Sequence, residues 1–389
     1  MKTLGIISEF NPFHNGHKYL LDRAKKELKI DLAVSIMSGD FVQRGQAAIM
    51  DKFSRARVAI NCGFDLVVEM PRFVTLQSAE FFAEKSISIL DKMDIDYLVF
   101  GIENINPNEF LKASQIIIEN ESEVDSLIQK LLASGLSYPK AHNEALLGFV
   151  SKDFLSANNI LALEYMRALH RTNSKIKAYP IIRIKTKNED KNINDKNFAS
   201  STAIRNNLNK DIKNLIPEVS YKELIDFRNE YKSFDYDYIY KVFSYKILIE
   251  KSPMSNFLGY EEGIDNYLSR LARTNYSYEN FLDQSTSQRY TRSRIKRLVL
   301  NYILSNTIDL NDFDLSFMNI LAYNKNASEN FKYWSQKLDI IIRKSDLKKL
   351  SKTDLLVYQI MIDASNLYSM GIGREIDYDF RHNNRPIDW

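Results

Sequence analysis

The sequence predicts an α/β fold: a doubly wound parallel sheet with a helical insertion, followed by an α-helical C-terminal domain. Short apolar strands alternate with amphipathic helices through the first hundred residues. Helical patterns then fill residues 107–170 before a further strand, and only helical patterns follow residue 215. Strands that alternate with helices are typical of right-handed crossovers and a parallel sheet.

The first four strands are predicted at short apolar runs, at residues 4–8, 32–37, 66–70 and 97–100. Amphipathic helices are expected between them, at residues 17–28, 52–62 and 79–93. A fifth strand is expected at residues 176–184, after the helical insertion. We therefore divide the chain into a sheet domain, residues 1–215, and a helical domain, residues 216–389.

Residues 185–197 are polar and lack apolar periodicity, which indicates a loop. The loop lies between a strand end and a helix start, so it is placed to cover a ligand at that edge of the sheet.

Composition excludes several classes of protein. Of 389 residues, 44% are hydrophobic and 26% charged, which is typical of a globular chain. The single cysteine, Cys62, can form neither an internal disulfide nor a cysteine zinc site. No apolar run reaches the ~18 residues of a membrane span, so we expect a cytoplasmic protein without membrane contact. The net charge is only +3, so nucleic-acid binding would depend on local clusters of cations.

The strongest motif is H-x-G-H, formed by His14, Gly16 and His17 between the first strand and the first helix. Two imidazoles, a glycine and the positive end of a helix dipole suit an anion, most plausibly a nucleotide phosphate. We take His14 and His17 as catalytic candidates. Lys18 could add charge there or be an exposed helix cation.

A second phosphate contact is expected at residues 198–205, where hydroxyl side chains precede a helical pattern. The structural explanation is that Ser200 or Ser201 is a helix N-cap and Arg205 a solvated helix charge. If they bind phosphate instead, the side chains that take part are Ser200, Ser201, Thr202 and Arg205.

Together these motifs resemble the nucleotidyltransferase branch of the Rossmann-like fold with the histidine signature. The strings GIISEFNPFHNGH, MSGDFVQRG, VFGIEN, SANNIL and FASSTAIR then resemble the bacterial tRNA(Met) cytidine acetate ligase family. The resemblance covers the first half of the chain and continues weakly into the second.

The resemblance implies that ATP is bound by the stretch from residue 7 to 20, by Gly101, by Asn158 or Asn159, and by Arg183. The first stretch consists of Ile7, Ser8, Glu9, Phe10, Asn11, Pro12, Phe13, His14, Asn15, Gly16, His17, Lys18, Tyr19 and Leu20. Gly101 would leave room for adenosine or form a turn. The chain departs from the family's pattern at Ala157, where a proline is usual, and at residues 185–190.

The stretch after the second strand supplies candidates for a small carboxylate substrate. We select Ser38, Gly39, Gln43 and Arg44, because amide and guanidinium groups suit acetate or phosphate. Asp40 is a third catalytic candidate. Its charge repels a carboxylate, so contact with Mg²⁺ or turn formation is its more plausible role.

A basic stretch in the helical domain is a candidate for tRNA binding through Arg289, Arg292, Arg294, Lys296 and Arg297. A solvated helix face is an equally good explanation.

By resemblance, ATP and acetate give acetyl-adenylate, and the acetyl group then passes to the wobble cytidine of elongator methionine tRNA as N4-acetylcytidine. Mg²⁺ is expected with ATP, with no protein side chain assigned to it, and the oligomeric state is left open. One alternative is an adenylyltransferase that forms a dinucleotide-type cofactor. The other is a non-catalytic nucleotide- or RNA-binding protein. The long helical region favours a macromolecular substrate, and the intact histidines favour catalysis.

Overall fold

The computed structural model describes residues 1–184, 193, 195–382 and 386–387. It divides into two compact units, each built from separate segments of the chain. Unit 1 consists of Met1–Ile7, Phe13–Ser35 and Ala79–Glu218. Unit 2 consists of Ser8–Pro12, Ile36–Ser78 and Val219–Trp389.

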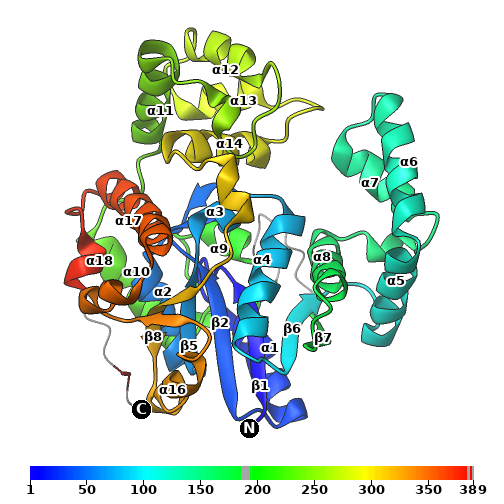
Figure 1. Cartoon of the computed structure of the whole chain (residues 1–389), viewed down its shortest axis with the longest axis vertical. Coiled ribbons are helices and arrows are strands. Elements are labelled where there is room, and N and C mark those ends of the chain that lie inside the picture. The colour runs from blue at the N-terminus through cyan, green and yellow to red at the C-terminus, as the bar shows by residue number, and fades with distance from the viewer. Residues whose placement is uncertain (185–192, 194, 383–385, 388–389) are drawn as a thin grey trace. The chain divides into compact units, whose positions relative to one another are not determined.

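The strands form a seven-stranded sheet in the order β7-β6-β1-β2-β5-β8-β9 (Figure 1). Five of them confirm the predicted strands: β1 (Thr3–Ser8), β2 (Leu32–Ser38), β5 (Leu66–Met70), β6 (Tyr97–Ile102) and β7 (Lys177–Ile182). β6 is parallel to both β1 and β7, with Leu4 opposite Tyr97 and Leu98 opposite Ala178. Every residue of β2 and β5 is buried, as expected for central strands covered on both faces.

Two further strands lie in the C-terminal half, β8 (Phe317–Tyr323) and β9 (Asp339–Ile341). The prediction that only helices follow residue 215 was wrong here. β8 pairs antiparallel with β5, and β9 pairs parallel with β8. A single apolar run such as FMNILAY fits a strand or a buried helix equally well, so its pattern does not reveal the strand.

In unit 1, helices flank the strands, and α4 packs against α8. Figure 1 shows the predicted helical insertion, α5 to α8, as a group that extends from β6 and β7. The helices are α1 (Asn15–Leu28), α4 (Ala79–Lys92), α5 (Pro107–Glu119), α6 (Glu121–Ala133), α7 (Tyr138–Leu146), α8 (Ala157–Arg171) and α9 (Ser201–Asn206).

In unit 2, α2 (Lys52–Asn61) packs on β5 and β8. A group of helices, α11 to α14, is held by aromatic contacts such as that between Phe243 and Phe281, whose ring centroids are 5.3 Å apart. The remaining helices are α3 (Arg72–Thr75), α10 (Glu218–Glu230), α11 (Tyr236–Tyr245), α12 (Ile264–Ala272), α13 (Tyr278–Ser285), α14 (Arg292–Ile303), α15 (Lys325–Ser328), α16 (Phe331–Trp334), α17 (Lys352–Ile372) and α18 (Tyr378–Arg381). A short hairpin pairs β3 (Phe41–Val42) with β4 (Gln46–Ala47).

The units differ from the predicted division at residue 215. The boundary between Glu218 and Val219 is close to it, but residues 8–12 and 36–78 group with the C-terminal half. The physical reason is that these segments bury charged and aromatic side chains against the rest of unit 2, as described below. Most of the predicted loop at 185–197 lies outside the described residues, which omit 185–192 and 194.

Candidate active site

The H-x-G-H motif forms the N-terminal cap of α1. His14 is the N-cap residue, and its Nδ1 accepts a hydrogen bond from the Gly16 N–H at 3.0 Å. The His14 N–H donates in turn to Nδ1 of His17 at 3.2 Å, which completes a capping box built from two imidazoles. The rings stack with their centroids 3.8 Å apart. A Cβ atom on Gly16 would lie 2.8 Å from the His14 ring, so this cap requires glycine.

Both histidines are neutral at neutral pH. Burial lowers the pKa of His14 well below its ordinary value, and His17, Arg183 and Arg205 lower it further. Burial, followed by the charge of Arg183, lowers the pKa of His17 to about 3. Because each Nδ1 accepts a backbone N–H, the one proton of each ring is on Nε2. The pair therefore offers two uncharged N–H donors, and the arginines supply the positive charge.

These rings line a pocket within unit 1. Its walls come from four parts of the sequence, three of which the motifs singled out. The lining residues are His14, Gly16, His17, Tyr19, Leu20, Gly101, Arg183, Ile184, Phe198 and Ala199.

Gly101 and Arg183 lie together at the ends of β6 and β7. A Cβ atom on Gly101 would lie 2.7 Å from Cγ of Arg183, so the glycine makes room first for this side chain. Arg183 Nε lies 3.3 Å from Oε1 of Glu103, which holds the guanidinium beside the pocket. Sequence reasoning did not select Glu103, and its place directly after a strand end was the only signal.

The two asparagines at the start of α8 have different roles. Asn159 is fully buried and binds the backbone of Glu103 twice, accepting from its N–H at 2.8 Å and donating to its carbonyl at 2.8 Å. Asn158 is partly exposed and donates to the Glu103 carboxylate. Asn159 therefore fixes the strand end, and Asn158 is the asparagine that a ligand could reach.

The hydroxyl stretch contributes to the same unit. Ser200 is the N-cap residue of α9, and its Oγ accepts from the Ala203 N–H at 3.0 Å. Arg205 donates to Oγ1 of Thr202 at 3.2 Å, and Ser201 is partly exposed. Asn15 donates to the Asn197 carbonyl at 2.8 Å, which ties the start of this stretch to the start of α1.

Other members of the predicted ATP stretch play structural parts. Lys18 forms an exposed ion pair with Asp22, one turn along α1. This favours the interpretation of Lys18 as an exposed helix cation over a role in binding phosphate. Residues 8–12 belong to unit 2, where the Phe10 ring packs 5.4 Å from that of Phe64 and Oδ1 of Asn11 accepts from the Ile49 N–H at 2.9 Å.

The comparisons with known proteins point to one family. A family model described as HIGH Nucleotidyl Transferase matches residues 1–382. A tRNA(Met) cytidine acetate ligase of Caldicellulosiruptor bescii is 33% identical, over 95% of this chain and 94% of the relative. A tRNA(Met) cytidine acetate ligase of Thermosipho africanus is 35% identical, over 92% of this chain and 88% of the relative.

This chain belongs to the tRNA(Met) cytidine acetate ligase family.

A solved structure agrees with this assignment. The crystal structure of Thermotoga maritima TmcAL bound with alpha-thio ATP has a TM-score of 0.86 and 27% identity, and the match covers 100% of both chains. The predicted family, fold class and enzyme class, a ligase, are therefore confirmed. No helix in the described part of the chain is both long and apolar enough to cross a membrane.

In unit 2, the loop after β2 is fixed by hydrogen bonds from a buried arginine side chain. Arg55 is fully buried and donates to four backbone carbonyls, those of Glu9, Ser38, Gly39 and Met50, at 2.5 to 3.0 Å. A side chain that satisfies four carbonyls fixes the loops that carry them. Sequence reasoning missed Arg55, because its spacing within α2 also fits an exposed helix cation.

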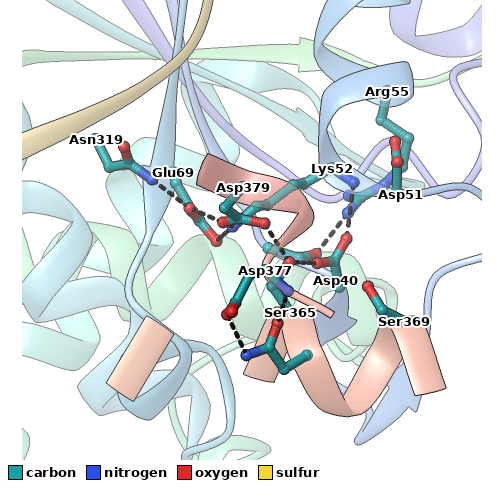
Figure 2. Close-up of polar contacts among 12 residues, drawn as sticks. Asp40, Asp51, Lys52, Arg55, Glu69, Asn319, Ser365, Ser369, Asp377 and Asp379 are labelled. Carbon is teal, nitrogen blue, oxygen red and sulfur yellow. Dashed lines mark hydrogen bonds and ion pairs between the residues drawn. The ribbon is translucent and has the colours of Figure 1, made fainter. Parts of the chain in front are cut away.

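A buried ionic network lies beside this loop, and we call Asp40, Lys52, Glu69 and Asp379 the Lys52 network (Figure 2). Lys52 Nζ lies 2.9 Å from both carboxylate oxygens of Glu69 and 2.5 Å from Oδ2 of Asp379. Ser365 Oγ lies 3.0 Å from Oδ2 of Asp40 and 2.5 Å from Oδ1 of Asp379, and its single hydroxyl proton is donated across the shorter contact, to Asp379. Burial raises the pKa of Glu69 to about 7, against the opposing charge of Lys52.

Asp40 is held on both sides of its carboxylate. Oδ1 accepts from the Lys52 N–H at 2.8 Å, and Oδ2 lies 3.0 Å from Oγ of Ser365. Its side chain is buried, and burial raises its pKa. The geometry favours the turn-forming role that the sequence left open for Asp40. Its catalytic role stays a prediction.

The acetate candidates lie in or beside the same loop. Ser38 is fully buried, and its Oγ has no hydrogen-bond partner among the described residues. A Cβ atom on Gly39 would lie 2.6 Å from Oε1 of Glu69, so a larger residue would have to displace a carboxylate of the Lys52 network. Gln43 is partly exposed and donates its backbone N–H to Glu9 at 2.9 Å, and Arg44 is exposed. Their role in binding acetate stays a prediction.

The predicted tRNA-binding cations are mostly paired. Arg289 and Arg294 both contact Glu261, and Arg292 contacts Glu279 and Asp283. Of the other two, Lys296 is partly exposed, and Arg297 donates to the Gln43 carbonyl at 3.3 Å. Burial lowers the pKa of the Arg297 guanidinium to about 10. The stretch therefore presents less uncompensated charge than its sequence suggests.

Proposed function

We propose that this chain activates acetate with ATP and transfers the acetyl group to the wobble cytidine of elongator methionine tRNA, in the cytoplasm. The observation that carries the proposal is the pair of neutral histidines stacked 3.8 Å apart in a pocket that also contains Arg183. The relatives are named for the substrates acetate and tRNA(Met), and the solved relative was crystallised with an ATP analogue.

In the first step, an acetate oxygen attacks the α-phosphorus of ATP, and the bond to the β-phosphate oxygen breaks. The products are acetyl-adenylate and pyrophosphate. Negative charge grows on the phosphate oxygens, and the two Nε2–H groups are suited to donate to them without themselves losing a proton. Such pre-positioned donors lower a barrier because they need no reorganisation during the reaction.

In the second step, the exocyclic amine of cytidine attacks the acetyl carbonyl. The bond between the acetyl carbon and the phosphate oxygen breaks, AMP leaves, and the amine loses one proton. A mixed anhydride makes this possible with a weak nucleophile, so no cysteine or serine nucleophile is required.

Mg²⁺ is proposed to accompany ATP. Among the described residues, no group of three or more histidine, cysteine or acidic side chains could hold a metal ion. Mg²⁺ usually keeps several waters and binds substrate phosphates, so the nucleotide itself would carry most of its ligands.

The test is exchange of radiolabelled pyrophosphate into ATP, with acetate, nicotinamide mononucleotide or phosphopantetheine as the acceptor. Exchange that depends on acetate, with labelled acetyl groups appearing on tRNA, supports the ligase. Exchange with a phosphate ester alone would support a cofactor-forming adenylyltransferase, and no exchange would support a binding protein.

Histidine variants connect this test to the pocket. We expect His17→Ala to reduce exchange by about 10²- to 10³-fold, the usual effect of removing one such donor. His170→Ala is the matched control, because His170 is exposed at the end of α8. Equal activity of His17→Ala and the control would remove His17 from the mechanism.

A further inference from the structure

Cations are concentrated at one edge of the sheet in unit 2, where β9 is the last strand. Residues 325–352 contain eight lysines and arginines but only three acidic residues, a net charge of +5, whereas the whole chain has +3. We call these eight cations the edge basic surface: Lys325, Lys332, Lys337, Arg343, Lys344, Lys348, Lys349 and Lys352. All eight are exposed.

The topology brings these cations together. The connection from β8 to β9 carries α15 and α16, and a 3₁₀ turn, Lys344–Lys349, leads from β9 into α17. β9 contacts both α16 and the 3₁₀ turn. Lys332 of α16 and the three lysines of the 3₁₀ turn therefore lie on the elements that flank one short strand.

Most of this charge is not compensated within the protein. Within the surface, Lys349 Nζ forms an ion pair with Oδ1 of Asp346 at 3.1 Å. Lys344 lies over the ring of Phe380, with its Nζ 4.7 Å from the centroid. A cation over a ring keeps its positive charge. Five of the cations, Lys325, Lys332, Arg343, Lys348 and Lys352, have no ion-pair partner among the residues that the structure describes.

A contribution to folding stability does not explain why so many cations are concentrated in the edge basic surface. Charged side chains do protect edge strands from pairing with other chains, but β9 has only three residues, which one or two lysines would protect. Lys352 is the first residue of α17, where the helix dipole repels a cation. Like charges at this density also repel one another. A bound anion would offset both the repulsion of Lys352 by the helix dipole and the repulsion among the cations.

The exposed aromatic ring of Tyr333 favours RNA over a simple anion as the ligand of this surface. The Tyr333 side chain is 49% exposed, and Lys337 Nζ lies 5.9 Å from its ring centroid. Flexible cations that neutralise phosphates, beside a ring on which a base can stack, are the usual elements of an RNA-binding surface.

We propose that the edge basic surface binds the sugar-phosphate backbone of RNA. The identity of this RNA as the tRNA substrate rests on the proposed function, whereas the surface itself rests on charge, exposure and pairing. The contrast with residues 289–297 is the central point, since three of those arginines contact Glu261, Glu279 or Asp283.

The experiment compares three triple variants of the full chain, each of which removes three positive charges. The first is Arg343→Gln with Lys348→Gln and Lys352→Gln. The second, Lys112→Gln with Lys130→Gln and Lys140→Gln, removes three exposed lysines of unit 1 as a matched control. The third replaces the arginines at 289, 292 and 294 by glutamine.

Binding of purified elongator methionine tRNA is measured between 50 and 300 mM salt, and thermal unfolding verifies that each variant is folded. For the first variant we expect the Kd for tRNA to rise by about tenfold or more. The slope of the logarithm of the binding constant against the logarithm of the salt concentration should become shallower by about 2, since each lost phosphate contact lowers its magnitude by about 0.7 to 0.9. The control should keep the slope of the wild type, and the third variant should lie between the two.

A first variant that binds tRNA with the affinity and slope of the wild type overturns the inference, even if it has lost binding to anionic vesicles or an acidic protein. An equal loss in the control would also overturn it, because only the overall charge would then matter. If the wild-type protein binds tRNA but transfers no acetyl group, and the first variant loses the binding, the proposed function fails and the surface stands.

Discussion

Replacing Lys52 by methionine tests the Lys52 network directly. The substitution keeps an unbranched side chain, shorter by the terminal amino group, and removes the charge of a side chain that is 1% exposed. It leaves the carboxylates of Glu69 and Asp379, which are 5% and 3% exposed, without their shared cation.

The expected loss of stability is large. Asn319 Nδ2 still donates to Glu69 at 2.6 Å, and Ser365 still donates to Asp379, but neither neutralises a charge. Removing one partner of a buried ion pair usually costs about 3 to 5 kcal/mol. We expect a loss in this range, which is a large part of the ~5 to 15 kcal/mol that stabilises a typical domain.

The measurement is urea unfolding at pH 8, followed by circular dichroism. Lys18→Met is the matched control, because Lys18 pairs with Asp22 at the surface, with side chains 40% and 55% exposed. Its loss should stay below about 1 kcal/mol. Adding Glu69→Gln to Lys52→Met should recover part of the loss, since one unpaired buried charge is then removed.

Two outcomes would refute this reasoning. One is a loss below about 1 kcal/mol for Lys52→Met, which would mean that water or rearrangement solvates the carboxylates. The other is a double variant less stable than Lys52→Met alone, which would mean that packing, not charge, determines the effect.

Three further predictions concern single positions. Gly101→Ala should displace Arg183 and raise the KM for ATP by about tenfold or more, as expected for a weakened charged contact, with little change in stability. Asn159→Ala should destabilise unit 1 by about 2 to 4 kcal/mol because it leaves two backbone groups unpaired, whereas Asn158→Ala should mainly weaken ATP binding. Glu69 has a folded pKa of about 7, above its ordinary 4.5, so the folded state binds more protons and its contribution to stability falls as pH rises from 4.5 to 7. Glu69→Gln should remove that slope.

Each of these has a control or a contrary result. Gly148→Ala adds a Cβ atom 3.6 Å from the nearest backbone oxygen and should leave the KM for ATP unchanged. Equal stability of the Asn158 and Asn159 variants in urea would contradict their assigned roles. A wild-type protein and a Glu69→Gln variant with parallel curves of unfolding free energy against pH would show that Glu69 does not titrate in this range.

Local sequence patterns predicted much of the fold and the histidine cap of the candidate active site. The strands β1, β2, β5, β6 and β7 were predictable because each is a short apolar run followed by a turn or helix signal. The His14 cap was predictable because its residues are neighbours in sequence. β8 could not be predicted, since nothing in its own residues shows that it pairs antiparallel with β5.

The Lys52 network was not predictable for a different reason. Lysine is almost never fully buried unless it is paired, and its partner Asp379 lies in a segment that no local pattern connects to it. The pairing of Arg289 and Arg294 with Glu261 could not be predicted from sequence either. The sequence therefore suggests more uncompensated positive charge in this stretch than the folded protein presents.

The bonds within unit 2 also have a consequence for synthesis of the protein on the ribosome. Ser365 and Asp40 are 325 residues apart in sequence, and Arg374 and Asp51 are 323 apart. At ~5 to 20 residues per second, the first partner waits on the order of 15 to 65 s for the second to emerge. During that interval Lys52, Asp51 and Asp40 lack their late partners Asp379, Arg374 and Ser365. Unit 2 is therefore completed only after unit 1 has been made, and the nascent segment 36–78 stays accessible to chaperones and proteases while translation proceeds.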